Sequence, residues 1–122
     1  DSGMFRAMQL AAAKALEAGE DWYASNNQNY RNRRQLAGEI MEALQCTYDD
    51  NQVGMFLWGK IPASCTDVEE LTEKVLHQAR VFITPGFIFG SNGARYIRIS
   101  LCCKDEKLAE ALERIKEMNK NK

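Results

Sequence analysis

The segment VFITPGFIFGSNGARYIRISL, residues 81–101, carries the pattern that decides the fold. After its glycine-containing middle, apolar and polar side chains alternate with a period of two, which is typical of a β-strand with one buried face. The predicted core face consists of Ile97, Ile99 and Leu101. The opposite face consists of Tyr96, Arg98, Ser100 and Cys102. Arg98 therefore lies at the centre of the mixed face, and its presence there needs an explanation.

The charge of Arg98 limits what its surroundings can be. Arginine stays protonated in proteins, so a covered guanidinium needs an anion nearby. Its planar group matches a carboxylate with two parallel hydrogen bonds. The residues alone leave two interpretations open: Arg98 binds an anionic ligand, or it forms a salt bridge to a protein carboxylate or is simply exposed. Arg95, in the same strand, is predicted to be solvated.

The loop before this strand, PGFIFGSNG at residues 85–93, places Gly86, Gly90 and Gly93 around Phe87 and Phe89. Glycine adopts positive φ angles and lets a ligand or another backbone approach closely. The loop is either an ordinary hairpin connection with buried aromatic residues or a segment that gives a ligand access to Arg98. No Gly-Lys-Ser or Gly-Lys-Thr element follows, so it is not a phosphate-binding loop.

A second segment, GMFLW at residues 54–58, leaves a similar choice open. Gly54 is consistent with a turn, and the residues after it predict a strand. Phe56 and Trp58 lie on the same face of that strand, because side chains two positions apart point the same way. This face either packs into the core or forms the wall of a pocket.

The remaining periodicities predict an α+β domain. Apolar residues at three- and four-residue steps predict a first helix that ends near Gly19, a long helix over residues 21–45 and a last helix capped by Asp105. Thr66 and Glu69 have the spacing of a capping box, which predicts one more helix. The predicted strands are 54–62, 81–84 and 95–103. This order favours a small, mostly antiparallel sheet of about three strands, covered by helices and preceded by a long lead-in helix.

The composition limits the classes of function. The chain has 122 residues and a formal net charge of −1, with 45% hydrophobic and 27% charged residues, as expected for one globular domain. It lacks the basic excess of a typical nucleic-acid-binding protein and the run of about 20 apolar residues that crosses a membrane. We therefore interpret the basic turn RNRR, residues 31–34, as a solvated face or an interdomain salt-bridge network rather than a nucleic-acid contact.

Few residues have the chemistry of a catalytic or metal site. None of the four cysteines forms a Cys-x-x-Cys pair, and His77 is the only histidine. The sequence therefore has neither metal-ligand spacing nor a Ser-His-Asp or Cys-His constellation. We expect reduced thiols, a cytoplasmic location, no metal site and no catalytic residue in this chain.

Four stretches together resemble the C-terminal part of class I/II aminotransferases, the pyridoxal-phosphate enzymes of fold type I. Residues 81–101 are the most specific, because they match the family pattern of Pro-Gly, Phe-Gly, Gly and Ile-Arg-Ile-Ser. Residues 54–62 resemble the first strand of the family's small domain. Residues 1–16 and 22–44 resemble two family helices, one beyond the cofactor lysine and one leading into the small domain. The opening DSGMF is similar to the aspartate and diaminopimelate aminotransferase branch.

The resemblance implies a domain division and a set of substrate-binding residues. Residues 1–20 would be a helix of the large cofactor domain, and residues 21–122 would be the small domain. Arg98 would pair with the α-carboxylate of the substrate. Phe56, with Gly54 before it, would line the substrate side of the pocket, and Gly86 would belong to the loop that shapes the approach to Arg98.

The resemblance also implies what the chain lacks. The family's Schiff-base lysine, its aspartate, tyrosine and phosphate-binding residues all precede the first matching stretch. We therefore expect no cofactor-binding residue here, and expect the chain alone to hold no pyridoxal phosphate and to be inactive. In a complete enzyme it would act with a large domain, normally in a homodimer, on an amino acid and a 2-oxo acid. The alternative is a non-enzymatic α+β module that binds an amino acid or has a regulatory role.

Overall fold

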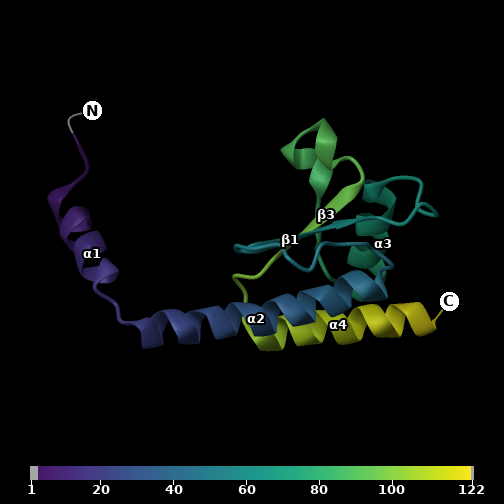
Figure 1. Ribbon diagram of the computed structural model, residues 1–122. Helices are drawn as coiled ribbons and strands as arrows, with labels where there is room; N and C mark the ends of the chain where they lie inside the picture. Colours follow the sequence, from purple (N-terminus) through teal and green to yellow (C-terminus); the bar gives the residue numbers. More distant parts are fainter. Residues whose placement is uncertain (1–2, 122) are drawn as a thin grey trace.

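A computed structural model describes residues 3–121 (Figure 1). The elements follow in the order α1 (Arg6–Leu16), α2 (Glu20–Ala43), β1 (Phe56–Lys60), α3 (Val68–Ala79), β2 (Thr84–Pro85), η1 (Gly86–Phe89), η2 (Ser91–Gly93), β3 (Tyr96–Ser100) and α4 (Asp105–Lys120), where η1 and η2 are short 3₁₀ helices. This is the predicted order of helices and strands, and the predicted α+β class is confirmed. In the described part of the chain, no helix has both the length and the apolar character needed to cross a membrane.

The sheet has three antiparallel strands in the order β1-β3-β2, so β3 is central. Arg98 is the middle residue of β3 and pairs with Trp58 on one side and with Thr84 on the other. The predicted alternation is confirmed, because Ile97, Ile99 and Leu101 are buried, whereas Arg98 is only half-buried. One face of the sheet therefore belongs to the core, and the other presents Arg98.

Three helices complete the core. In Figure 1, α4 runs side by side with the C-terminal part of α2, and α3 lies next to the sheet. The largest fully buried side chains come from all of these elements: Met41, Leu57, Val75, Ile97, Leu101 and Ile115. Gly59 of β1 lies against the side chain of Met41 so closely that a Cβ atom would collide with its sulfur. The absence of a side chain at this position therefore lets α2 approach the strand.

The N-terminal part of the structure stands apart from this core. In Figure 1, α1 and the first half of α2 extend away from the sheet. Helix α1 has no buried residue, and the buried residues of α2 all lie between Ala37 and Met41. Large apolar side chains are exposed there, including Phe5 at 72% and Trp22 at 58%. Helices normally bury an apolar face to become stable, so this segment lacks the packing that the rest of the chain has.

Both predicted helix caps are wrong by one position. The N-cap of α3 is Asp67, not Thr66, and its carboxylate accepts a hydrogen bond from the Glu70 N–H at 2.8 Å. Asp105 is the first residue of α4 rather than its cap, and Lys104 precedes it without a side-chain cap. The Asp105 carboxylate instead accepts a hydrogen bond from Arg33 Nε at 3.0 Å. An acidic residue in the first turn still stabilises the helix through its dipole.

The predicted solvation of Arg95 is also wrong. Its guanidinium donates to the carbonyl oxygens of Pro62 at 2.8 Å, Cys65 at 2.8 Å and Thr66 at 3.0 Å. Carbonyl groups of an irregular segment need donors when they are covered, and this one cation supplies several. Arg95 therefore holds the segment between β1 and α3 against the start of β3.

Two arginines of the basic turn have partners within the same domain. Arg33 donates to the Leu101 carbonyl at 3.1 Å as well as to Asp105, so it ties α2 to the junction of β3 and α4. Arg34 Nη2 donates to the Gly54 carbonyl at 2.8 Å. These contacts replace the predicted solvated face for Arg33 and Arg34, and they fix the long helix to the segments that precede β1 and follow β3.

The outer edge of β1 is closed by the backbone of Thr47, which pairs with Lys60, and by the side chain of Gln52. The amide group of Gln52 donates to the Trp58 carbonyl at 2.8 Å and accepts from the Trp58 N–H at 2.9 Å. These two bonds imitate the pairing that a neighbouring strand would provide. Because β1 is an edge strand, its unpaired backbone groups would otherwise face water or another chain.

We expect Gln52→Ala to lower the free energy of unfolding by about 1–2 kcal/mol, because two hydrogen bonds to backbone are lost. Urea titration followed by tryptophan fluorescence measures this. Gln45→Ala, which removes an exposed glutamine, is the control and should change little. Equal stability of both variants would mean that Gln52 does not hold the edge.

Candidate functional site

The Arg98 side chain is surrounded by aromatic rings. Its Cζ atom lies over the rings of Phe56 at 4.1 Å and Phe89 at 3.9 Å, and 5.9 Å from that of Trp58. Within residues 3–121 the guanidinium makes no hydrogen bond and no ion pair. Cation–π attraction therefore holds the charge, and the salt bridge considered from the sequence is not formed. The group keeps its N–H donors available for a ligand.

Phe89 reaches Arg98 from outside the sheet. It belongs to η1, follows β2 by only a few residues and is 50% exposed. Its ring meets that of Trp58 edge-to-face, with centroids 5.5 Å apart and an interplanar angle of 73°. This arrangement is favourable for aromatic pairs. The loop that the sequence left undecided therefore folds back onto the mixed face of the sheet.

A close contact between two glycines shapes this loop. Gly86 is buried, and a Cβ atom on it would collide with the Gly93 carbonyl oxygen and lie 2.7 Å from that of Tyr96. A Cβ atom on Gly93 would in turn collide with the Gly86 carbonyl. Both obstacles are backbone atoms, which move less easily than side chains. Gly86 therefore brings η1 and η2 together, and this packing sets where Phe89 lies.

We expect Gly86→Ala to lower the free energy of unfolding by about 1–3 kcal/mol, which is the usual cost of adding atoms to a closely packed site. Chemical denaturation measures the effect. Gly19→Ala is the matched control, since a Cβ atom there meets nothing within 4 Å. Unchanged stability of the Gly86 variant would show that the loop does not need this contact.

Gly54 lies at the other end of the candidate site. It immediately precedes Met55 and β1, has a φ of 90° and has open space where a side chain would be. Its carbonyl is the acceptor for Arg34. A shallow groove of about 470 Å³ beside it includes Tyr30. Of the predicted substrate-binding residues, Arg98 and Phe56 are in direct contact. Gly54 lies two residues before β1, and Gly86 is the first residue of η1.

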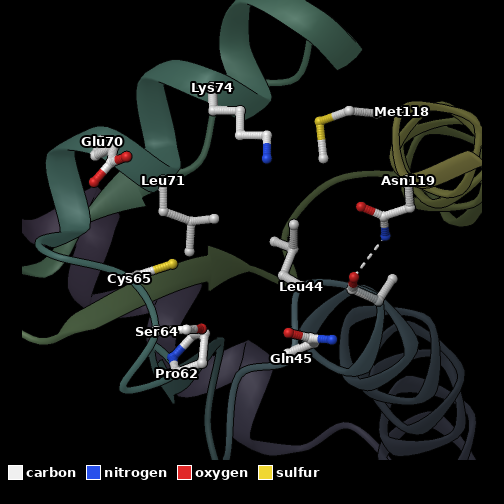
Figure 2. A pocket seen from close by; sticks show the side chains of 11 residues that line it. Leu44, Gln45, Pro62, Ser64, Cys65, Glu70, Leu71, Lys74, Met118 and Asn119 are labelled. Carbon is white, nitrogen blue, oxygen red and sulfur yellow. Dashed lines mark hydrogen bonds between the residues drawn. The ribbon is translucent and has the colours of Figure 1, made fainter. Parts of the chain in front are cut away.

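A separate cavity lies between the C-terminal ends of α2 and α4, the loop after β1 and α3 (Figure 2). Its volume is about 460 Å³, and none of the predicted substrate-binding residues lines it. Figure 2 shows the Lys74 ammonium pointing into it, with Leu44 and Met118 nearby. The Asn119 amide closes one side by donating to the Ala43 carbonyl at 2.7 Å. This cavity was missed from the sequence, because its lining comes from segments far apart in the chain.

The remaining ionisable groups offer little catalytic chemistry. Burial and the nearby Cys65 thiol raise the pKa of Cys46 to about 12, so this thiol stays protonated near neutral pH. His77 is exposed and contacts Glu73 on its own helix, with 3.0 Å between Nε2 and Oε2. Among the described residues, no three histidine, cysteine or acidic side chains are grouped closely enough to hold a metal ion.

The family model for class I and II aminotransferases matches residues 3–115. The chain belongs to the class I and II aminotransferase family. LL-diaminopimelate aminotransferase from Maridesulfovibrio salexigens is 35% identical over 118 residues, which cover 97% of this chain and 30% of the relative. Transaminase BacF from Bacillus subtilis is 33% identical over 118 residues, again with 30% of its length covered. The chain thus spans about 30% of the curated aminotransferases that it matches.

Solved aminotransferase structures contain the same arrangement. The apo structure of BacF from Bacillus subtilis superposes with a TM-score of 0.77 at 32% identity, over 96% of this chain and 30% of that one. The aromatic aminotransferase from Pyrococcus horikoshii superposes with a TM-score of 0.76 at 31% identity, over 93% of this chain and 31% of that one. Cystalysin from Treponema denticola, solved with its pyridoxal 5′-phosphate cofactor, shares the fold at 21% identity and a TM-score of 0.69.

Proposed function

We propose that this chain forms the C-terminal, carboxylate-binding part of a pyridoxal-phosphate-dependent aminotransferase, which moves an amino group from an amino acid to a 2-oxo acid. The observation that carries the proposal is the state of Arg98. In a chain of this family, its guanidinium has aromatic neighbours and no carboxylate partner among the described residues. A cation held in this way is ready to bind the carboxylate that amino acids and 2-oxo acids share.

In this proposal Arg98 contributes binding and orientation. Two parallel hydrogen bonds from its guanidinium fix the carboxylate and thereby the direction of the neighbouring carbon atom. Fixing that carbon reduces the entropy that must be lost at the reacting bond. Phe56 covers one side of the guanidinium and excludes water there. Gly54 and Gly86 remain predicted substrate-binding residues. The prediction is supported by their backbones, because the positive φ of Gly54 and the close contact of Gly86 with Gly93 help to place the segments that carry Phe56 and Phe89.

The cavity that Lys74 enters does not fit pyridoxal phosphate. A site for this cofactor needs an amine within a closed pocket and a set of donors for the phosphate. Lys74 points into a cavity, but Glu70 also lines that cavity and its carboxylate would repel a phosphate. We therefore propose that the cofactor is held outside this chain and that the chain alone is inactive.

The proposal includes the partners of the chain. The division at residues 20 and 21 stays as predicted: residues 1–20 belong with a large cofactor domain and residues 21–122 form the small domain. The exposed apolar side chains in and just before α1, such as Leu16 and Phe5, support this, because they have no partner in the rest of the described domain. We further propose a homodimer and a cytoplasmic location. Four unpaired cysteines agree with that location.

The test is an activity assay of the complete protein that contains this chain. Purified protein is loaded with pyridoxal phosphate and given a panel of amino acids with 2-oxoglutarate, and amino-group exchange is measured. We expect exchange with the protein and none with the 122-residue chain alone. A complete protein that absorbs as a cofactor complex but exchanges no amino group with any pair would contradict the proposal.

The amino-acid-binding module is tested separately, by calorimetric titration of the 122-residue chain with the same amino acids. The aminotransferase proposal expects no tight binding, because the chain provides only the carboxylate side of the site. Saturable micromolar binding of one amino acid would favour the module instead.

A further inference from the structure

Two aromatic rings hold the Arg98 guanidinium in the site. Its Cζ atom lies over the Phe56 ring, 4.1 Å from the centre, and over the Phe89 ring, 3.9 Å from the centre. Both distances are well within the roughly 6 Å over which a cation is attracted to an aromatic face. Phe56, Arg98 and Phe89 thus form one stack of side chains.

Contact with two rings limits how far the guanidinium can move, because a ring at van der Waals distance excludes other atoms from the space that it fills. Phe56 belongs to β1 and Phe89 to η1, so the two rings reach the group from separate elements. The N–H donors of the guanidinium lie in the plane of the group and stay available for a ligand.

The Phe89 side of this stack has its own support. Trp58 meets the Phe89 ring edge-to-face, and Gln52 holds the Trp58 backbone by two hydrogen bonds. The stack is thus built from the edge strand β1, the central strand β3 and the loop that contains η1. The sequence left open whether the face of Phe56 and Trp58 forms a pocket wall, and Phe89 was assigned no role in the site.

We propose that Phe89, supported by Trp58, is a positioning residue, which holds the Arg98 guanidinium against Phe56 so that its donors face an arriving carboxylate. The inference rests on the proposed function, since it supposes that Arg98 binds the substrate carboxylate. A bidentate pair requires that both donors face the two oxygens together. Preorganising the donors lowers the entropy lost on binding.

One arm of the test examines the stack itself, in the 122-residue chain. The Nε–H proton of Arg98 is observed by NMR in wild type, Phe89→Leu, Phe89→Tyr and the control Phe87→Leu. Protons above an aromatic face are shifted upfield by the ring current. We expect the upfield shift in wild type, Phe89→Tyr and Phe87→Leu and its reduction in Phe89→Leu. An unchanged shift in Phe89→Leu would overturn the proposal.

The other arm measures the consequence in the complete cofactor-loaded enzyme. We expect Phe89→Leu to lower kcat/KM for the amino acid about three- to tenfold, in line with the loss of one cation–π contact. The corresponding amine without a carboxylate should react as it does with wild type. Phe89→Tyr should restore the amino acid reaction, and Phe87→Leu should not impair it. Equal losses for the amino acid and the amine would indicate a general structural role and overturn the positioning role.

The two arms also separate this inference from the proposed function. A complete protein without aminotransferase activity would refute the proposed function and, with it, the role of Phe89 in binding substrate. The NMR arm would still decide whether the stack exists. Normal wild-type activity together with an unaffected Phe89→Leu enzyme would refute the positioning role alone.

Discussion

Replacing Arg98 with lysine in the complete enzyme is expected to lower kcat/KM for the amino acid about thirtyfold to several thousandfold. This corresponds to a loss of about 2–5 kcal/mol of transition-state stabilisation. Lysine keeps the positive charge but has no planar pair of donors, and its ammonium cannot stack between Phe56 and Phe89. The carboxylate would then be held by a single charge in a poorly defined orientation.

Steady-state kinetics over a range of amino acid concentrations measure this effect. Arg114→Lys is the matched control, because Arg114 is exposed on α4 and its ion pair with Glu110 is solvent-accessible. Such pairs contribute little. A value of kcat/KM for Arg98→Lys equal to that of the control would reject the assignment of Arg98 to the carboxylate.

Shortening Ile97 to alanine is expected to lower the free energy of unfolding by about 2–5 kcal/mol. Ile97 is fully buried in the central strand, next to Gly59 on β1 and Pro85 on β2. Shortening its side chain leaves a cavity on the core side of β3, one position before Arg98. The site then loses part of the packed surface that holds β3 in place.

Urea unfolding of the 122-residue chain measures this loss. Ile88→Ala is the control, since Ile88 is the same residue type but 57% exposed. Its removal should cost well under 1 kcal/mol. Similar losses for the two variants would mean that β3 is not the centre of the core.

The sequence predicted those features that depend on local periodicity. The alternation of Ile97, Arg98 and Ile99 separated the core face from the exposed face, and both assignments are confirmed. Such features are accessible because neighbouring residues in a strand or helix have fixed relative directions.

The features that depend on distant segments were not predicted. Arg95 carries the same charge as Arg98 and lies three positions away, but its partners are carbonyl groups about thirty residues earlier in the chain. Phe89 was singled out only as part of a glycine loop, because the return of η1 onto the sheet depends on the contact between Gly86 and Gly93. Whether an arginine is solvated, hydrogen-bonded or packed against aromatic rings could be decided only from the three-dimensional structure.

The central claim is that Arg98, in contact with Phe56 and Phe89, binds the substrate carboxylate. A crystal structure of the complete enzyme with a bound carboxylate substrate analogue tests it most directly. We expect two hydrogen bonds of about 2.7–2.9 Å from the Arg98 guanidinium to the two carboxylate oxygens, with both rings still in contact with the group. A carboxylate bound to another cation, with Arg98 paired to an acidic side chain of the protein, would contradict it.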